Sequence, residues 1–213
     1  MRLLLASQNP HKLRELSALL EPHELDPLPE GMALPPETGT TFAENALIKA
    51  RAAATATERA AVADDSGIEA AALGGAPGVW SARFAGERAS DEQNLERLMR
   101  EVPPDGDRRV AYVCVLAYVE PGVAEQVVHG RCEGELAVEP RGAGGFGYDP
   151  AFVPSELRDG RTMAELDPAE KDAISHRGRA ARELLRLLAE ETVRVPRGPF
   201  SVGGRRRSRR AAS

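Results

Sequence analysis

The sequence predicts an α/β fold with a mixed sheet, in one domain at residues 1–193 followed by an arginine-rich tail at 194–213. Three observations predict this fold. Short apolar runs alternate with segments of helical periodicity, which is typical of strands joined by helical crossovers. Two longer strand-like runs are separated by a short segment that begins with Glu120-Pro121-Gly122, so they are expected to form an antiparallel hairpin. The length of 213 residues suits one domain with a substantial core and is too short for two ordinary domains.

Composition excludes several classes of protein. With 42% hydrophobic and 29% charged residues, the chain is expected to be globular rather than disordered or fibrous. Its apolar runs are shorter than the roughly 20 residues of a membrane helix, and the apolar start Met1–Ala6 is too short for a signal peptide. Two cysteines, Cys114 and Cys132, argue against a disulfide scaffold. We therefore expect a cytoplasmic protein with no membrane partner.

Caps and periodicity define the elements of the first half. Asn9-Pro10 is typical of a helix N-cap followed by proline at the first helical position. Thr41-Phe42-Ala43-Glu44 matches a capping box. The expected elements are a strand at Arg2–Ala6, a helix from Pro10 to residue 20, a short strand near Glu24–Leu28, a helix after Thr41 to about Arg59, and a buried strand at Ala61–Ala63 that ends at Asp64-Asp65.

The second half is read in the same way. Glycine and proline dominate Gly74–Gly86, and Ser90-Asp91 is typical of a helix cap. The expected elements are a helix to about Arg100, strands at Val110–Val119 and Gln126–Val138, a glycine-rich loop at Gly142–Pro150, and a last helix that begins near Asp167-Pro168 or Ser175 and ends near Glu191.

Charge is distributed unevenly along the chain. The tail at 194–213 holds seven arginines and no acidic residue. Without them, 21 basic and 33 acidic residues give the body a net charge of about −12. Such a body repels nucleic acid, so we expect no stable nucleic-acid partner. The tail is expected to be disordered, with a weak tether to a polyanion as the alternative.

Arginine is the ordinary basic residue of this chain. Of 28 basic residues, 25 are arginine and only Lys12, Lys49 and Lys171 are lysine. One interpretation is that codon usage favours arginine and that the three lysines are chance exceptions. The other interpretation is that a compact ammonium is needed where these three residues lie. All three fall in the segments described next, which favours one shared polyanion site.

Residues 7–12, Ser7-Gln8-Asn9-Pro10-His11-Lys12, join the first expected strand to the first helix. Such a turn presents free backbone N–H groups and the positive end of a helix dipole, which suit a phosphate. Lys12 opposes that dipole, so an anion is expected beside it. The alternative is an ordinary asparagine cap followed by a surface lysine.

Two acidic segments are candidates for a metal site. Asp64-Asp65-Ser66-Gly67 follows a buried strand, where carboxylates can hold Mg²⁺ and orient or deprotonate a water. An Asp-Asp-Ser-Gly turn without function is the alternative. Glu44 begins the helix that carries Lys49, and it is either the capping-box residue or a metal ligand at the helix N-terminus.

Two later segments are candidates for recognition of a base. Phe146 lies on a glycine loop, where a ring can stack on a base, and Asp149 can accept from a ring N–H. A turn anchored by a buried Phe146 is the alternative. Lys171–Arg177 combines lysine, serine, histidine and arginine, which suit phosphate and carbonyl groups, with a solvated helix face as the alternative. Histidine and cysteine do not cluster at zinc spacing, which excludes structural zinc.

Together these motifs resemble the inosine triphosphate pyrophosphatase family, which removes non-standard purine nucleoside triphosphates. The resemblance spans about residues 1–191 and leaves out the tail. The motifs that carry it are Ser7-x-Asn9-x-x-Lys12, Thr41-Phe42-x-Glu44-Asn45-Ala46-x-x-Lys49-Ala50, Ala63-Asp64-Asp65-Ser66-Gly67, Leu73-Gly74-Gly75-Ala76-Pro77-Gly78 with Ser81-Ala82-Arg83, Gly145-Phe146-Gly147-Tyr148-Asp149-Pro150, and Ser175-His176-Arg177.

The resemblance implies a long twisted mixed sheet flanked by helices, two lobes around a nucleotide cleft, and a homodimer. It implies that ITP, dITP and XTP are hydrolysed with Mg²⁺ to the monophosphate and pyrophosphate, which keeps these bases out of DNA and RNA. It implies Asp65 as general base and Mg²⁺ ligand, with Glu44 as a second metal contact. The implied substrate-binding residues are Asn9, Lys12 and Lys49 on the polyphosphate with Ser66 nearby, Phe146 stacked on the purine, Asp149, Lys171, His176 and Arg177 at its edge, and Ser7, Gln8, Pro10, His11, Gly147 and Tyr148 in the same segments.

Two positions depart from the family pattern. Gln8 stands where glycine or serine is frequent, which puts close approach of the backbone to a phosphate in doubt, and Trp80 replaces a frequent tyrosine. Other functions stay open at this point. They are a related pyrophosphatase for pyrimidine or modified nucleotides, a nucleotide sensor without catalysis, and a phosphatase with an aspartate nucleophile.

Overall fold

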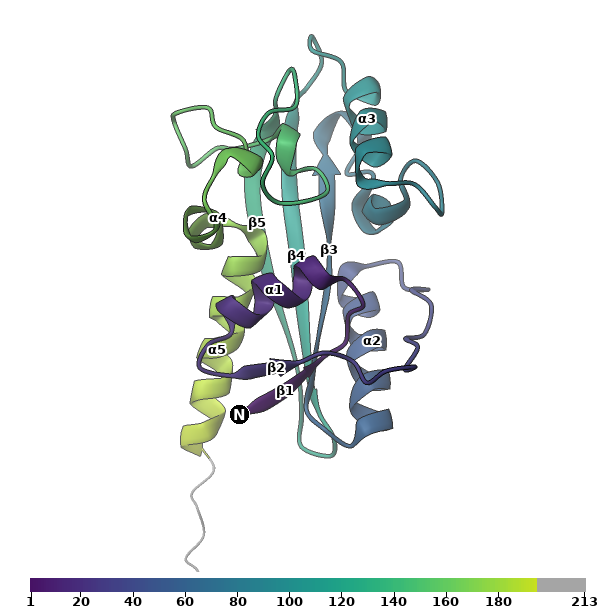
Figure 1. The fold of residues 1–213 in the computed structure, drawn as a ribbon, viewed down its shortest axis with the longest axis vertical. Coiled ribbons are helices and arrows are strands. Elements are labelled where there is room, and N and C mark those ends of the chain that lie inside the picture. Colours follow the sequence, from purple (N-terminus) through teal and green to yellow (C-terminus); the bar gives the residue numbers. More distant parts are fainter. Residues whose placement is uncertain (195–213) are drawn as a thin grey trace, which may run out of the picture.

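The computed structural model describes residues 1–194, which form a six-stranded sheet of order β2-β1-β3-β4-β5-β6 (Figure 1). β1 pairs parallel with β2 and β3, whereas β3 to β6 pair antiparallel, so the expected mixed sheet is confirmed. The strands are β1 (Arg2–Leu5), β2 (Glu24–Asp26), β3 (Ala61–Ala70), β4 (Arg109–Glu120), β5 (Ala124–Leu136) and β6 (Phe152–Pro154). The helices are α1 (Pro10–Leu19), α2 (Phe42–Thr57), α3 (Asp91–Glu101), α4 (Pro168–Ile174) and α5 (His176–Arg194), with short 3₁₀ turns that include η2 (Gly78–Arg83) and η3 (Asp149–Ala151).

Local signals in the sequence place the helices. Asn9 caps α1, and capping boxes begin α2 at Thr41 and α3 at Ser90, as expected. The last expected helix is two helices, because Ser175 between them has an extended backbone. A helix therefore begins at each of the two expected starts: α4 after Asp167 and α5 after Ser175. The extended Ser175 separates the two helices.

β3 does not end at Asp64-Asp65, as the sequence predicted, but continues to Ala70. Antiparallel pairing with β4 keeps it extended over its whole length. β1 pairs with β3 only as far as Val62, so the two aspartates lie in β3 directly past the carboxyl end of β1. This is the position at which parallel α/β sheets bind ligands. The alternative of an Asp-Asp-Ser-Gly turn is wrong, because these four residues lie inside β3.

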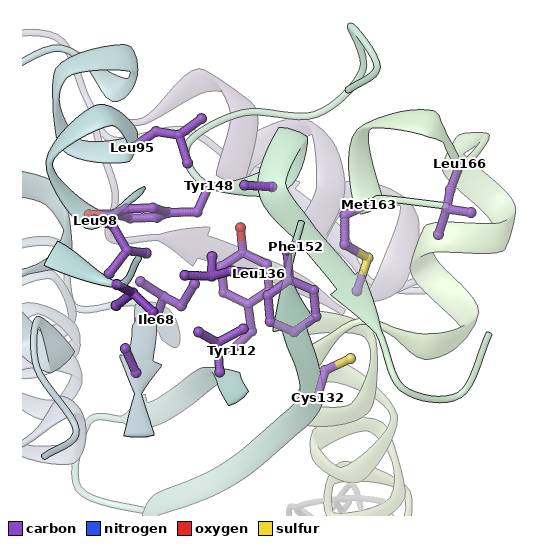
Figure 2. Close-up of a cluster of buried hydrophobic side chains, with 14 residues drawn as sticks. Ile68, Leu95, Leu98, Tyr112, Cys132, Leu136, Tyr148, Phe152, Met163 and Leu166 are labelled. Atoms are coloured by element: carbon purple, nitrogen blue, oxygen red, sulfur yellow. The ribbon is translucent and has the colours of Figure 1, made fainter. Parts of the chain in front are cut away.

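The long strands β3, β4 and β5 pass through two lobes (Figure 1). In the lower lobe of that view, α2 packs on one side of β3 and β4, while α1 and α5 pack on the other. The upper lobe holds α3, β6 and a buried cluster that includes Tyr112 of β4 and Phe152 of β6, whose rings stack with centroids 4.3 Å apart (Figure 2). The fold therefore has the expected two lobes on one sheet.

Gly130 of β5 determines how closely α5 approaches the sheet. A Cβ at this position would collide with the carbonyl oxygen of His176, so only glycine lets the start of α5 lie directly on the strand. This contact fixes the height at which His176 and Arg177 enter the space between the lobes. β6 was not predicted, and most of the expected tail, residues 195–213, lies outside the described chain.

Candidate active site

A pocket opens between the lobes, at the N-terminus of α1 and beside the middle of β3. Its lining residues come from β3, β4, η2, the glycine loop and four of the helices, namely α1, α3, α4 and α5 or the residue before them. Ten of the predicted substrate-binding residues line it: Asn9, Lys12, Ser66, Phe146, Gly147, Tyr148, Asp149, Lys171, His176 and Arg177. The other five do not line it: Ser7, Gln8, Pro10 and His11, which belong to the same turn as Asn9 and Lys12, and Lys49 of α2.

The turn before α1 is ordered by its own side chains. Asn9 Oδ1 accepts from the backbone N–H groups of His11 at 2.8 Å and Lys12 at 3.3 Å, and Ser7 Oγ accepts from Asn9 N at 3.2 Å. Lys12 extends from this first turn and forms an ion pair with Asp64. The anion expected beside Lys12 is therefore, in the free protein, an aspartate of β3.

Asp64 is completely buried and holds cations from both ends of the chain. Besides Lys12, it accepts from Arg177 Nε at 2.9 Å and from Ser66 Oγ at 2.9 Å. Burial would raise the pKa of Asp64, but the charges of Arg177 and Lys12 outweigh it and hold this pKa well below its ordinary value. Asp64 therefore stays ionised and anchors two substrate-facing cations.

Asp65 has a different environment, although it is the next residue. Its Oδ1 accepts from Lys49 Nζ at 2.9 Å, and its buried Oδ2 has no hydrogen-bond partner among the described residues. Lys49 Nζ also donates to Glu37 Oε1 at 2.6 Å and to the backbone carbonyl of Asp64 at 2.9 Å. Burial raises the pKa of Asp65 to about 6, because Lys49 compensates it only partly and Glu37 adds a second negative charge.

Glu44 does not join this cluster. Its Oε2 accepts from Thr40 N at 2.7 Å, from Thr40 Oγ1 at 3.0 Å and from Thr41 N at 3.2 Å, so the side chain closes the capping box of α2 at the surface. These bonds lower the pKa of Glu44. The expectation that Glu44 is the second metal contact stays a prediction, and the acid that shares Lys49 with Asp65 is Glu37.

The glycine loop before β6 holds Phe146 half-exposed in the pocket, so this ring is not the buried anchor of a turn. The buried anchor is Tyr148, whose hydroxyl donates to Ser81 O at 2.7 Å. Asp91 of α3 also holds the loop, because its carboxylate accepts from Gly147 N at 2.9 Å. The His11 ring lies 5.0 Å from Phe146, centroid to centroid.

Asp149 is occupied by groups of the protein itself. Its Oδ1 accepts from the Tyr112 hydroxyl at 3.0 Å, and its Oδ2 accepts from Phe146 N at 2.9 Å and from Lys171 Nζ at 2.7 Å. Asp149 therefore positions Phe146 and Lys171, although it also lines the pocket. A direct contact of this carboxylate with a base would add to three hydrogen bonds already present.

Glu15 of α1 joins the two cations at the junction of α4 and α5. It accepts from Lys171 Nζ at 2.8 Å and from Arg177 Nη1 at 2.5 Å. Lys171 and Arg177 also lie near the Phe146 ring, with Nζ 5.3 Å and Cζ 5.6 Å from its centroid. Both cations are buried, so the expected alternative of a solvated helix face is wrong here.

His176 presents a neutral imidazole. Its ring stacks on Tyr112 with centroids 4.5 Å apart, and its buried Nδ1 has no hydrogen-bond partner among the described residues. Burial and the nearby charge of Arg177 hold the pKa of His176 well below its ordinary value. A neutral ring with one unpaired nitrogen can hydrogen-bond a ligand in the pocket without adding charge.

Sequence reasoning missed two acids of the site. Glu15 lies in the middle of an amphipathic helix, where a charged residue normally faces solvent, and Glu37 lies in the proline-rich stretch without any periodic pattern. The odd placement of all three lysines was the available signal. Each lysine is buried or nearly so and meets a carboxylate, and those carboxylates include Glu15 and Glu37.

The fold and the pocket define an α/β nucleotide-phosphate-binding protein, with cations and an aspartate past the carboxyl end of a parallel strand. Comparison with known proteins makes this specific. Residues 3–187 match the Ham1 family, and the chain belongs to that family.

Relatives and solved structures agree with this assignment. A dITP/XTP pyrophosphatase of Coxiella burnetii is 48% identical, with 89% of this chain and 98% of the relative covered. One of Frankia alni is 52% identical over the same shares of both chains. The structure of the Staphylococcus aureus Ham1 protein superposes with a TM-score of 0.80 at 38% identity and covers 90% of this chain and 100% of its own. The family resemblance inferred from the motifs is confirmed.

Proposed function

We propose that this protein hydrolyses noncanonical purine nucleoside triphosphates, namely ITP, dITP and XTP, to the monophosphate and pyrophosphate. The names of its relatives support this substrate class. The observation that carries the proposal is the Asp65 carboxylate, which is buried, has a pKa of about 6 and keeps Oδ2 without a partner beside a cation-lined pocket. Such a carboxylate can take a proton from a water at neutral pH.

A divalent metal fits Asp65 and Glu37. These two carboxylates supply hard oxygen ligands, and the unpaired Oδ2 of Asp65 is the kind of buried atom that a cation satisfies. The described residues contain no group of three or more His, Cys, Asp or Glu side chains around one position. A two-carboxylate site suits Mg²⁺, which usually keeps water and substrate phosphate oxygens as its other ligands. Bound there, the metal would neutralise charge on the phosphates.

The cations of the pocket would exchange their internal partners for the triphosphate. Lys12 and Lys49 each hold an aspartate in the free protein, and phosphate oxygens offer the same charge-assisted hydrogen bonds. The backbone N–H groups at the start of α1 add the positive end of its dipole. Asp65 would hold the attacking water and accept its proton as the bond to the leaving pyrophosphate breaks.

The base would lie on Phe146, with His176 and Arg177 at the purine edge. Hypoxanthine and xanthine carry a 6-oxo acceptor, whereas adenine carries a 6-amino donor. Donors from His176 and Arg177 would therefore leave adenine unpaired, which can separate substrates by about 10⁴-fold. We assign Asp149 and Glu15 to holding Phe146, Lys171 and Arg177 in place.

Three further expectations belong to this proposal. We propose that the protein works as a homodimer, in the cytoplasm, and that it removes noncanonical nucleotides before they enter DNA or RNA. In the described part of the chain, none of the helices is long and apolar enough to span a bilayer.

One panel of substrates tests the proposed function. ITP, dITP, XTP, GTP, ATP and UTP are incubated with Mg²⁺, and pyrophosphate and orthophosphate are measured separately. We expect pyrophosphate as the first product and preference for ITP, dITP and XTP. Preference for UTP or a methylated UTP would favour a pyrimidine house-cleaning enzyme. Tight binding of ITP without turnover would indicate a sensor, and orthophosphate as first product would indicate a phosphatase.

Glu37 and Glu44 are the two candidates for the second metal contact, and they give a matched pair of variants. Glu37→Gln is expected to lower ITP turnover by about 10–100-fold and to raise the Mg²⁺ concentration needed for half-maximal activity, because it removes a charged metal contact. Glu44→Gln is expected to stay within about twofold of wild type, because glutamine also serves a capping box. Equal losses in both variants would mean that both acids contact the metal, and a loss in Glu44→Gln alone would assign the contact to Glu44.

A further inference from the structure

Arg83 is a cation of the site that the proposed function leaves without a role. It is the last residue of η2, and the two residues before it, Ser81 and Ala82, line the pocket. Its Nη1 lies 3.6 Å from Glu37 Oε2, on the other side of the carboxylate that shares Lys49 with Asp65. Arg83 therefore reaches the proposed metal and water site from the upper lobe, whereas Lys12 and Lys49 reach it from the lower lobe.

The guanidinium of Arg83 differs from the other cations of the site because it lies farther from its neighbouring carboxylates. Lys49, Lys171 and Arg177 donate to carboxylates at 2.5–2.9 Å. Arg83 lies 3.6 Å from Glu37 and 3.8 Å from Glu87, which is too far for good hydrogen bonds. Its Nε is buried without a hydrogen-bond partner among the described residues. A buried donor without a partner is costly, so a ligand that accepts from it is favoured.

Its neighbours hold Arg83 in this position. Trp80 lies under the guanidinium, with Cζ 4.4 Å from the ring centroid, and this contact leaves the donors at the edge of the plane available. η2 itself packs on β3 at Gly67, where a Cβ would collide with Ser81 Oγ and with the carbonyl oxygen of Gly78. Gly67 thus allows the close approach of η2 to the strand that carries Asp65.

We propose that Arg83 binds the pyrophosphate portion of the substrate and stabilises it as the leaving group. This inference rests on the proposed function, because cleavage next to the α-phosphorus places growing negative charge on the β-phosphate. A guanidinium can donate to two oxygens of one phosphate at once, and one of these oxygens would be an acceptor for the buried Nε of Arg83. The monophosphate product lacks these phosphate groups, so Arg83 should distinguish triphosphate and pyrophosphate from monophosphate.

Calorimetric titration of the full chain with inorganic pyrophosphate or IMP, each with Mg²⁺, tests this role. Arg83→Gln is expected to weaken pyrophosphate binding about 10–100-fold and to leave IMP binding within about twofold. Its kcat/KM for ITP should fall by a similar factor. Arg88→Gln is the matched control, since this exposed arginine lies five residues further on, and it should change neither constant.

Arg83→Lys keeps the charge but loses the planar guanidinium, so we expect an intermediate loss of pyrophosphate binding. This variant also tests the proposal if Arg83→Gln fails to fold. The proposal is overturned if pyrophosphate binding is unchanged in the folded variant, or if pyrophosphate and IMP weaken equally. Failure of the proposed function would look different. In that case wild-type protein would release no pyrophosphate from ITP, whatever the Arg83 variants bind.

Discussion

Asp65→Asn is expected to lower turnover of ITP by about 10³-fold or more, while ITP still binds. The change removes the proposed base, whose loss alone accounts for about 10²–10⁴-fold, and removes one charge from the metal site. The shape of the side chain is kept, and Lys49 retains Glu37 and the Asp64 carbonyl as partners. Single-turnover release of pyrophosphate and equilibrium binding of ITP separate the two effects.

The same substitution should stabilise the metal-free protein at high pH. Because folding raises the pKa of Asp65 from 3.8 to about 6, the folded state holds a proton that the unfolded state releases. The cost of the buried charge is therefore absent below about pH 4, grows between pH 4 and 6, and is fully present above pH 6. Removing this charge by Asp65→Asn should raise the free energy of unfolding by up to about 3 kcal/mol at pH 8, which raises Tm by several degrees, and should leave both unchanged at pH 3.5.

Asp64→Asn is the matched comparison, and its effect on stability has the opposite sign. The pKa of Asp64 is held well below 3.8, so its charge stabilises the folded protein above the unfolded pKa and this contribution is lost as pH falls. Melting curves of both variants without metal, at pH 3.5 and pH 8, give the comparison. Near-normal turnover in Asp65→Asn would mean that Asp65 is not the base. A lowered Tm of Asp65→Asn at pH 8 would mean that the buried charge of Asp65 does not destabilise the folded protein.

The elements that the sequence predicted well are those defined by local chemistry. Asn9, Thr41 and Ser90 begin helices because each side chain caps backbone N–H groups within three residues. β3 was cut short because its second half, which contains Ser66 and Gly67, has the composition of a turn. Pairing with the neighbouring strand β4 over ten residues overrides that composition, and a partner strand 40 or more residues away leaves no local signal.

The candidate site was predicted in the same uneven way. Asp65, the three lysines and Phe146 stand in recognisable motifs, and the structure places them in or beside one pocket. Glu44 was found as a candidate because a glutamate at the start of a helix is visible in a sequence, whereas Glu37 lies in a proline-rich stretch and gave no such signal. The path of the loop 27–41, which brings Glu37 to Lys49, depends on contacts with distant residues.

Replacing each lysine by arginine is expected to impair activity, although arginine is the ordinary cation of this chain. The largest effect is expected for Lys49→Arg, with kcat/KM for ITP reduced by about 10²-fold or more. Lys49 Nζ directs three N–H groups to three acceptors at 2.6–2.9 Å in a buried site. A tetrahedral ammonium meets that arrangement, whereas a longer planar guanidinium would displace Asp65 or Glu37.

Burial alone does not explain why lysine is used, because Arg177 is buried as well. Arg177 spreads its nitrogens over Asp64, Ser66 and Glu15, which surround a flat group. Lys171 instead brings one nitrogen between Glu15 and Asp149, at 2.8 Å and 2.7 Å. The geometry of the acceptors therefore selects the cation, and Lys171→Arg should loosen both Phe146 and Arg177.

Lys12→Arg is expected to have the smallest effect of the three, because this side chain is the least buried and shares Asp64 with Arg177. Steady-state kinetics with ITP for the three variants should therefore rank Lys49 before Lys171 and Lys171 before Lys12. An exposed exchange in the other direction, Arg100→Lys, is the control and should be silent. If all three lysine variants match wild type, the scarcity of lysine reflects codon usage alone, and the acceptor geometry around Lys49 tolerates either cation.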